Sequence, residues 1–197
     1  MSAVAGPADP TAGRSALAWW GAFGAIAGAV VIADVLSKAW IDAGFPLASP
    51  YAPVGAPGGP TPVLGDLVRI AKGYNDGGIF GLLGSTAPIL AAASVAVIGI
   101  IVLVQARQGR GDPLLTVALG LLLGGAIGNL LDRVRFGHVV DFVDMGIGGL
   151  RFYTFNVADA AISVAVVLLL AHGILGDRLG RLTGRPARGA DAARGRA

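Results

Sequence analysis

Two short motifs in this sequence place an asparagine three residues before an aspartate, next to otherwise apolar sequence. GNLLDR contains Asn129 and Asp132, and FNVAD contains Asn156 and Asp159. Residues with this spacing lie on one face of an α-helix. The amides and carboxylates of the two motifs are therefore expected to form a polar cluster, which indicates a function rather than chance polarity.

A third polar pair lies in DVLSK, where Asp34 and Lys38 are four residues apart and share a helical face. A charged side chain within an apolar span costs about 2.5–3.5 kcal/mol on insertion scales, so it normally faces the interior of a bundle. Apolar residues flank both Asp34 and Asp159. We therefore expect these two carboxylates to lie inside a bundle, whereas Lys38 alone could extend to the lipid headgroups.

Carboxylates can hydrolyse a peptide bond when two of them share one proton. The ionised carboxylate removes a proton from water, and the protonated one polarises the carbonyl under attack. Asp132, Asp141 and Asp159 are all candidates for such a pair, with Asp34 one turn deeper. Asp141 lies in the apolar segment VVDFV, where burial favours the protonated form. The residues therefore favour Asp141 with Asp159 and leave Asp132 as an alternative.

The remaining composition argues against several other kinds of active site. The chain has no cysteine, which excludes thiolate nucleophiles and disulfides, and its only histidines are His138 and His172. A histidine zinc site and a Ser-His-Asp arrangement are therefore poorly supplied. Asn129 and Asn156 could orient the acids or hold a peptide, and Arg133 offers a cation for backbone or headgroup oxygens.

Three other functions compete with hydrolysis. A proton-coupled transporter needs intramembrane acids, but it predicts polar residues through the depth of the spans, and two of the apolar blocks are almost bare of them. A lipid phosphotransferase would use several aspartates to hold magnesium, and chelators would inhibit it. A purely structural membrane protein would leave the two Asn-Asp motifs without a role.

The elements that must position these residues are membrane-spanning helices. The chain has 54% hydrophobic residues and a mean hydropathy of +0.72. A helix needs about 20 apolar residues to cross about 30 Å of hydrocarbon. Four blocks meet this length, at about 17–40, 86–106, 114–132 and 155–175. Asp112 followed by Pro113 predicts the start of the third helix, as N-cap and first helical residue.

An even number of spans leaves both termini on one side of the membrane. Nine Lys and Arg residues lie on the side of the termini and six on the other, which predicts cytoplasmic termini. We expect residues 1–16 to be a flexible cytoplasmic segment and residues 17–175 to form the membrane domain. We expect residues 176–197 to be a basic, disordered cytoplasmic tail.

This topology places the polar cluster and two connections, 41–85 and 133–154, at the extracytoplasmic face. The alternation at residues 67–70 predicts short strands at the membrane surface. The expected fold class is an all-α integral membrane protein with four transmembrane helices, a small extracytoplasmic β-containing loop region and a surface amphipathic segment. Segment 41–85 is expected to act as a mobile lid.

Four blocks of the chain resemble the pattern of the lipoprotein signal peptidases, also called signal peptidase II or prolipoprotein signal peptidases. They are DVLSK at 34–38, NDGGIFGLL at 75–83, GGAIGNLLDRVRFGHVVDF at 124–142 and FNVADAAI at 155–162. The resemblance covers about residues 17–175. It implies an aspartic endopeptidase of the bacterial cytoplasmic (inner) membrane. Such an enzyme cleaves a diacylglyceryl-modified prolipoprotein immediately before its lipidated cysteine.

The resemblance also implies roles for residues, with Asp141 and Asp159 as the catalytic pair. The residues expected to shape the pocket or support the substrate are Asp34, Lys38, Asn75, Gly77, Asn129, Asp132, Arg133, Asn156 and Ala158. It implies no metal ion or organic cofactor, and inhibition by globomycin-type cyclic peptides. Membrane lipids are the other expected partners. We expect no nucleic-acid partner, and a monomer.

Two features depart from the family pattern. The usual N-x-G-A-A-F becomes NDGGIF here, and Gly78 predicts more backbone freedom in the loop that would cover the site. The Pro/Gly-rich segment at 49–62 is longer than expected.

Overall fold

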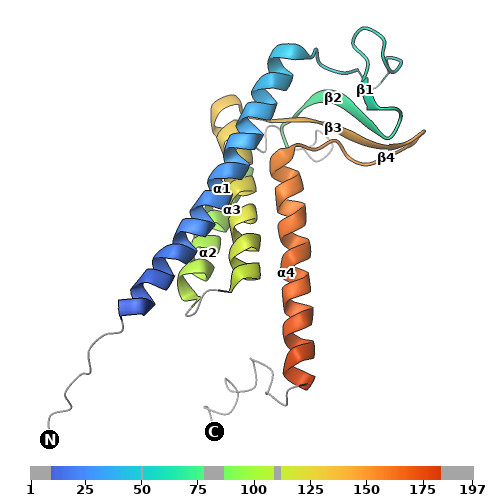
Figure 1. Cartoon of the computed structure of the whole chain (residues 1–197). Helices are drawn as coiled ribbons and strands as arrows, with labels where there is room; N and C mark the ends of the chain where they lie inside the picture. The colour runs from blue at the N-terminus through green and yellow to red at the C-terminus, as the bar shows by residue number, and fades with distance from the viewer. Residues whose placement is uncertain (1–9, 50, 78–86, 109–111, 183–197) are drawn as a thin grey trace, which may run out of the picture.

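The computed structural model describes residues 10–49, 51–77, 87–108 and 112–182. This part of the chain folds into four helices and a four-stranded antiparallel sheet. The helices form a bundle with the sheet at one end, while α1 begins and α4 ends at the other (Figure 1).

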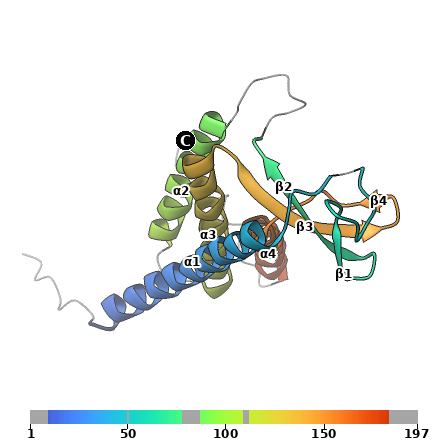
Figure 2. The same cartoon turned by 90° about the horizontal axis from the view of Figure 1, so that it is seen from above.

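The helices are long enough to span a membrane. Their bounds are Pro10–Gly44 (α1), Ala87–Arg107 (α2), Pro113–Phe136 (α3) and Val157–Leu182 (α4). Apolar stretches of spanning length occupy Ala16–Gly44, Pro88–Arg107, Pro113–Phe136 and Val157–Ile174. The prediction of four spans is therefore confirmed. The central helix is α3, which packs against the other three (Figure 2).

The start of α3 follows the prediction from its sequence. Asp112 has an extended backbone, and its carboxylate accepts a hydrogen bond from Leu115 N at 3.1 Å. Pro113 occupies the first helical position, where its missing N–H costs nothing. The helix ends at Phe136, and Gly137 follows it with a φ of 76°, the left-handed conformation that glycine adopts readily.

Two helices extend beyond the expected limits of the membrane domain. Residues 10–16 belong to α1 and residues 176–182 to α4, so the expected flexible and disordered segments are shorter than 1–16 and 176–197. Once a helix has formed, each further residue adds a backbone hydrogen bond at little cost, so a helix need not end at the membrane surface. Residues 1–9 and 183–197, and Gly78, lie outside the described residues.

Close packing between α1 and α3 depends on glycines four residues apart on α3. A Cβ atom on Gly120 would lie 3.0 Å from Ile26 Cβ, and one on Gly124 would lie 2.7 Å from Ala27 O. Gly128 faces Asp34 in the same way. Small residues at this spacing let helix backbones approach closely. Around this contact, the buried core of α1, α2 and α3 is formed by Phe23, Ala27, Ile101, Leu119 and Leu123.

The sheet comes from both connections at this end of the bundle. Its strands are Thr61–Leu64 (β1), Val68–Asn75 (β2), Val139–Ile147 (β3) and Leu150–Arg151 (β4), in the order β1-β2-β3-β4. The strand predicted at residues 67–70 is confirmed as the start of β2. The longer strand β3 was not predicted. It carries Asp141, which pairs with Gly73 of β2.

Much of the described part of segment 41–85 is hydrogen-bonded, and its expected role as a mobile lid stays a prediction. Residues 41–44 complete α1, and residues 61–64 and 68–75 belong to the sheet. Between them, Ser49 N donates to Gly58 O at 2.7 Å and Gly55 N donates to Pro60 O at 2.8 Å, which closes a compact loop. The described connections contain turns and strands, which confirms the expected β-containing loop region; the expected amphipathic surface segment stays a prediction.

A buried lysine joins the end of α1 to the sheet. Lys72 of β2 forms an ion pair with Asp42 at 2.6 Å, and its ammonium also donates to the backbone oxygens of Asp42 and Phe45. A cation is favourable at the carbonyl-rich C-terminus of a helix. Lys72 therefore holds β2 against the helix that carries Asp34 and Lys38.

Candidate active site

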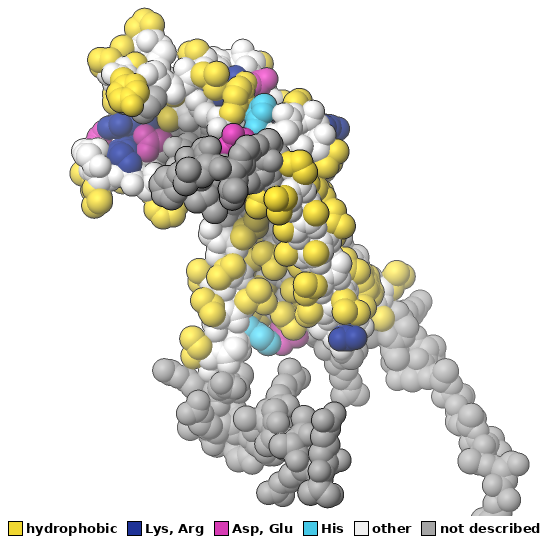
Figure 3. Space-filling view, turned by 180° about the vertical axis from the view of Figure 1, so that it is seen from behind, with side chains coloured by type: hydrophobic (Ala, Val, Ile, Leu, Met, Phe, Trp, Pro, Cys, Tyr) yellow, Lys and Arg dark blue, Asp and Glu magenta, His cyan; other side chains and the backbone are white. Residues whose placement is uncertain are grey.

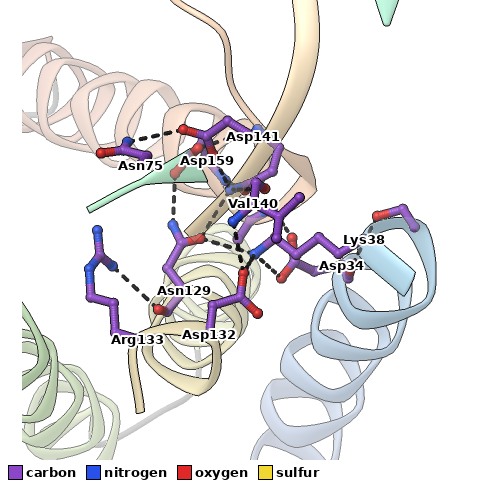
Figure 4. Close-up of polar contacts among 12 residues, drawn as sticks. Asp34, Lys38, Asn75, Asn129, Asp132, Arg133, Val140, Asp141 and Asp159 are labelled. Atoms are coloured by element: carbon purple, nitrogen blue, oxygen red, sulfur yellow. Dashed lines mark hydrogen bonds and ion pairs between the residues drawn. The ribbon is translucent and has the colours of Figure 1, made fainter. Parts of the chain in front are cut away.

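The residues predicted from sequence converge where the sheet meets the helices (Figure 4). Five elements supply them: α1, the end of α3, the start of α4, and strands β2 and β3. The residues of the cluster are Asp34, Lys38, Asn75, Asn129, Asp132, Asp141, Asn156 and Asp159. Side chains from positions 34 to 159 therefore form one hydrogen-bonded network.

Lys38 is bound on three sides within the buried part of this network. Its ammonium lies 2.7 Å from Asp34 Oδ2 and 2.9 Å from Asp132 Oδ2, and it donates to Asn129 Oδ1 at 3.2 Å. Lys38 is buried, so it does not extend to the headgroups. A buried charge is tolerated when it is paired and hydrogen-bonded. This amine therefore fixes α1 against α3.

The two acids that bind Lys38 are also held by backbone groups. Asp34 Oδ1 accepts from Ala158 N at 2.9 Å, which ties α1 to the first turn of α4. Asp132 Oδ2 accepts from Val140 N at 3.2 Å, which ties the end of α3 to β3. Both carboxylates are thus occupied in joining elements.

Asp141 is buried and accepts hydrogen bonds at both carboxylate oxygens. Asn75 Nδ2 donates to Oδ2 at 3.0 Å, and Asn156 Nδ2 donates to Oδ1 at 2.8 Å. Burial raises the pKa of Asp141 to about 6; the hydrogen bond from Asn75 opposes this rise, and the charge of Asp159 adds to it. Asp141 therefore retains its proton to a higher pH than an exposed aspartate.

Asp159 lies at the first turn of α4 and is part of a capping box. Asn156 is the N-cap residue, and its Oδ1 accepts from Asp159 N at 2.9 Å, while Asp159 Oδ2 accepts from Asn156 N at 3.3 Å. Two backbone N–H groups that the helix leaves unpaired are satisfied in this reciprocal way. The other carboxylate oxygen accepts from Asn129 Nδ2 at 2.7 Å.

Asn156 connects the two acids. Its side chain is fully buried, and Nδ2 lies within hydrogen-bond distance of Asp141 Oδ1, Asn129 Oδ1 and Val140 O. The amide of Asn156 binds Asp141, the amide of Asn129 binds Asp159, and the two amides bind each other. Together they set the positions of the two acids. The two carboxylates therefore have a fixed relative placement before any substrate binds.

A cavity of about 1060 Å³ lies beside this pair of acids. Asp141, Asp159 and Asn75 line it on one side. Most of its remaining wall is apolar, from the sheet and from the first turns of α4, and includes Ile147, Leu150, Phe152, Phe155 and Val164. A mostly apolar cavity with a few convergent polar groups is the usual form of a binding site.

Three of the expected supporting residues contact the network through backbone groups, and no hydrogen bond within the described part of the chain joins them to Asp141 or Asp159. Gly77 N donates to Asn75 Oδ1 at 2.9 Å, and Ala158 contributes its backbone N–H to Asp34. Arg133 donates to Asn129 O at 3.3 Å, and among the described residues its buried Nε has no hydrogen-bond partner. His138 packs against Tyr74, with ring centroids 4.2 Å apart and ring planes tilted by 38°.

Sequence reasoning missed several residues that shape the site. Val140 contributes backbone N–H and C=O groups, and Arg151 and Thr154 line the cavity. The reciprocal capping by Asn156 and Asp159 was also missed, although an N-cap residue followed at N3 by an acid could have indicated it. Within the part of the chain that the structure describes, no three His, Cys, Asp or Glu side chains are grouped to hold a metal ion.

Comparisons with known proteins agree with this architecture. The profile of the family described as signal peptidase (SPase) II matches residues 26–175. A lipoprotein signal peptidase of Coxiella burnetii is 36% identical over 150 residues, covering 74% of this chain and 85% of that protein. A lipoprotein signal peptidase of Listeria monocytogenes serotype 4b is 38% identical over 122 residues, covering 58% and 79%.

A third relative and a solved structure extend the comparison. A lipoprotein signal peptidase of Sphingopyxis alaskensis is 48% identical over 99 residues, and this match spans 47% of the chain and 56% of that protein. A bacterial membrane enzyme solved by the in meso method superimposes with a TM-score of 0.68 at 28% identity, covering 80% of this chain and 90% of that one. With its four spans and its buried cluster of carboxylates and amides, the chain belongs to the signal peptidase II family.

Proposed function

We propose that this chain is an aspartic endopeptidase in which Asp141 and Asp159 form the catalytic pair. Its substrate is a diacylglyceryl-modified prolipoprotein, which it cleaves immediately before the lipidated cysteine. The observation that carries the proposal is the placement of two carboxylates, joined through Asn156, at the wall of an apolar cavity. Family membership supports the same reaction.

The two acids have different surroundings, which suits them to different steps. Asp141, with its raised pKa, carries the shared proton and polarises the carbonyl of the scissile bond. Asp159 lies at the N-terminus of α4, where the helix dipole favours a negative charge, and it removes a proton from the attacking water. The proton gained by Asp159 then passes to the leaving amine. The products are a signal peptide with a new carboxylate and a protein with a free amino group on its lipidated cysteine.

The substrate reaches these acids from within the bilayer. An apolar signal peptide is helical in lipid because every backbone polar group must be satisfied there. The cavity is lined on one side by membrane-spanning α4 and on the other by the sheet, so it suits a substrate whose cleavage site lies at the membrane surface. Binding of the apolar segments away from the scissile bond would position it between the acids.

The same proposal covers the setting of the enzyme. The chain acts as a monomer in the bacterial cytoplasmic (inner) membrane, with both termini in the cytoplasm and the site at the extracytoplasmic face. It uses no metal ion or organic cofactor. Globomycin-type cyclic peptides occupy the cavity beside Asp141 and Asp159 and so compete with the substrate.

The direct test is cleavage of a purified diacylglyceryl-modified prolipoprotein in the presence of EDTA. Asp141→Asn and Asp159→Asn are each expected to lower kcat by at least about 100-fold, since each removes one proton-transfer group. Asp112→Asn is the matched control: it changes a carboxylate at the opposite end of α3, and asparagine caps a helix as well as aspartate does. It should cleave like the wild type.

Two results would contradict the proposal. Loss of wild-type cleavage on addition of EDTA would show that the acids act through a metal. Turnover near the wild-type rate in either Asn variant would mean that the pair is wrongly assigned, and Asp132 would be the next acid to test.

A further inference from the structure

Two hairpin turns at the same end of the sheet carry exposed apolar side chains. The turn between β1 and β2 carries Leu64 and Leu67, and the turn between β3 and β4 carries Ile147 and Leu150. The two turns are adjacent because Gly146 N donates to Leu67 O at 3.0 Å. Leu64, Ile147 and Leu150 are 62%, 73% and 84% exposed. We call these four residues the apolar rim.

The charged groups around the rim neutralise one another. Arg151 binds Asp144 at 2.9 Å and donates to Asp66 O at 2.6 Å, and Arg69 pairs with the same two aspartates. Two arginines and two aspartates therefore form a cluster without net charge that joins the two turns. An edge whose charges are paired in this way can approach hydrocarbon at a lower cost than one with a free charge.

The rim lies next to the lipid-facing surface of a membrane span. The sheet extends sideways from the bundle at the level where α4 begins (Figure 1), and the view from behind shows paired charges at the far end of the sheet (Figure 3). Ile147, Leu150 and Leu67 line the same cavity as Ser163 and Val164 of α4. Below these, Val167, Leu170 and Ile174 are exposed along the span.

Between the rim and the span lie two further exposed aromatic residues, Phe152 and Tyr153, which lead into the first turn of α4. Tyrosine is enriched where hydrocarbon meets water because its ring is apolar and its hydroxyl is polar, and phenylalanine adds apolar surface beside it. The apolar surface is thus continuous from the rim, through these rings, to the span. A patch of this kind on a soluble surface would be unfavourable, whereas lipid would cover it.

We propose that the apolar rim inserts into the leaflet beneath the sheet, at the boundary between the lipid headgroups and the acyl chains. The partner is the phospholipid bilayer. Insertion holds the sheet level with the first turn of α4, and lipid rather than protein then closes the side of the cavity that faces away from the bundle. This proposal concerns membrane contact and does not depend on the peptidase chemistry.

The absence of native cysteine makes the proposal testable by site-specific labelling. Leu150→Cys and Ile147→Cys place one thiol each on the exposed rim, and an environment-sensitive nitrobenzoxadiazole label is attached to it. Val54→Cys is the matched control, an exposed apolar residue in segment 51–60, which rises from the sheet on the side away from the helices (Figure 1). Each labelled full-length protein is reconstituted into vesicles of phosphatidylcholine and phosphatidylglycerol.

The measured quantities are the emission maximum and the quenching by lipids that carry a doxyl group near the headgroup. The emission maximum of both rim labels should lie at a shorter wavelength than that of the same label in water, and doxyl lipid should quench their emission. The Val54 label should show neither effect. Rim labels that are quenched no more than the Val54 label would overturn the proposal. A second outcome would also overturn it: rim labels that doxyl lipid does not quench, with energy transfer between labels on different protein molecules. A second copy of the chain would then cover the rim. Neither measurement requires turnover, so a failure here is distinct from a failure of the peptidase assignment.

Discussion

At the scale of single residues, the two Asn-Asp motifs have the same spacing and different roles. Asn156 and Asp159 cap α4 reciprocally, and their remaining polar atoms face Asp141 and Asn129. Asp132, in contrast, binds Lys38 and a backbone N–H of β3. The motif in α4 therefore satisfies a helix terminus and places an acid with the same atoms, whereas the motif in α3 joins elements.

The hydrogen bond from Asn75 to Asp141 predicts a change in the pH dependence of cleavage. Asn75 donates to the ionised carboxylate and so lowers the pKa of Asp141; its removal should raise that pKa above its value of about 6. In Asn75→Ala, the singly protonated pair should persist to higher pH, and the alkaline limb of the kcat profile should move up by about 0.5–1 pH unit, the equivalent of one hydrogen bond. Tyr74→Phe changes the neighbouring side chain and should leave the limb in place. A downward shift in Asn75→Ala would contradict this reading.

The raised pKa of Asp141 also predicts how stability depends on pH. The buried carboxyl binds its proton more tightly in the folded state, with a pKa of about 6, than in the unfolded state, with a pKa of 3.8. Its favourable contribution is therefore fully present below the unfolded value and is lost as the pH rises through about 6, an effect on the order of 3 kcal/mol. Thermal unfolding in detergent should show this loss in the wild type but not in Asp141→Asn. Equal pH slopes for the two proteins would contradict it.

At the scale of elements, the α1–α3 contact determines where the buried ion pairs meet. Gly120, Gly124 and Gly128 let the helix backbones approach, and this approach brings Asp34 and Lys38 to Asn129 and Asp132. In a membrane, where lipid is as apolar as the side chains, such close packing takes over much of the role that water exclusion has in soluble proteins. Lys72 adds a second tie, between α1 and β2.

Substitution at this contact should be costly in a position-dependent way. A Cβ atom on Gly124 would lie 2.6 Å from Val30 Cβ, so Gly124→Ala should lower the free energy of unfolding by about 1–3 kcal/mol through overpacking. Gly24→Ala on α1 is the control, because nothing lies within 4 Å of its added Cβ. It should be neutral or stabilising by up to about 1 kcal/mol through helix propensity. Thermal unfolding in detergent separates the two, and similar midpoints would show that the helices can shift apart without cost.

At the scale of the whole molecule, the sheet and the bundle share one site. The sheet supplies Asn75 and Asp141, the bundle supplies Asp159, and the cavity lies between them. All of this is at one end of the spans, while Asp112 and His172 pair at the other end, 3.6 Å apart. The site therefore lies at one membrane surface.

The proposed orientation can be checked on intact cells with a membrane-impermeant thiol reagent. Val54 belongs to segment 51–60, which rises from the sheet on the side away from the helices, and Gln108 follows α2 at the opposite end of the bundle (Figure 1). Outside labelling is expected for Val54→Cys alone, and labelling of Gln108→Cys only after the cells are permeabilised. The reverse pattern would place both termini outside and the acids in the cytoplasm.

Much of the fold could be predicted because the cost of placing a residue in lipid is local. The four spans follow from apolar length, and the start of α3 follows from Asp112 and Pro113. The extents of α1 and α4 could not be predicted from hydropathy, because helical hydrogen bonding continues past the membrane surface. Strand β3 was missed because VVDFV is apolar without the alternation that reveals a half-buried strand.

The sequence by itself determined that carboxylates and amides lie near one end of the spans, and its resemblance to a family pointed to Asp141 and Asp159. From the residues alone Asp132 remained an alternative, since adjacency to Arg133 says nothing about what lies opposite in space. Only the tertiary structure showed that Lys38, 94 positions away along the chain, lies 2.9 Å from Asp132, and that Asn156 bridges toward Asp141. The physical reason is that a carboxylate's role depends on its burial and its partners, and helix packing brings those partners from distant parts of the chain.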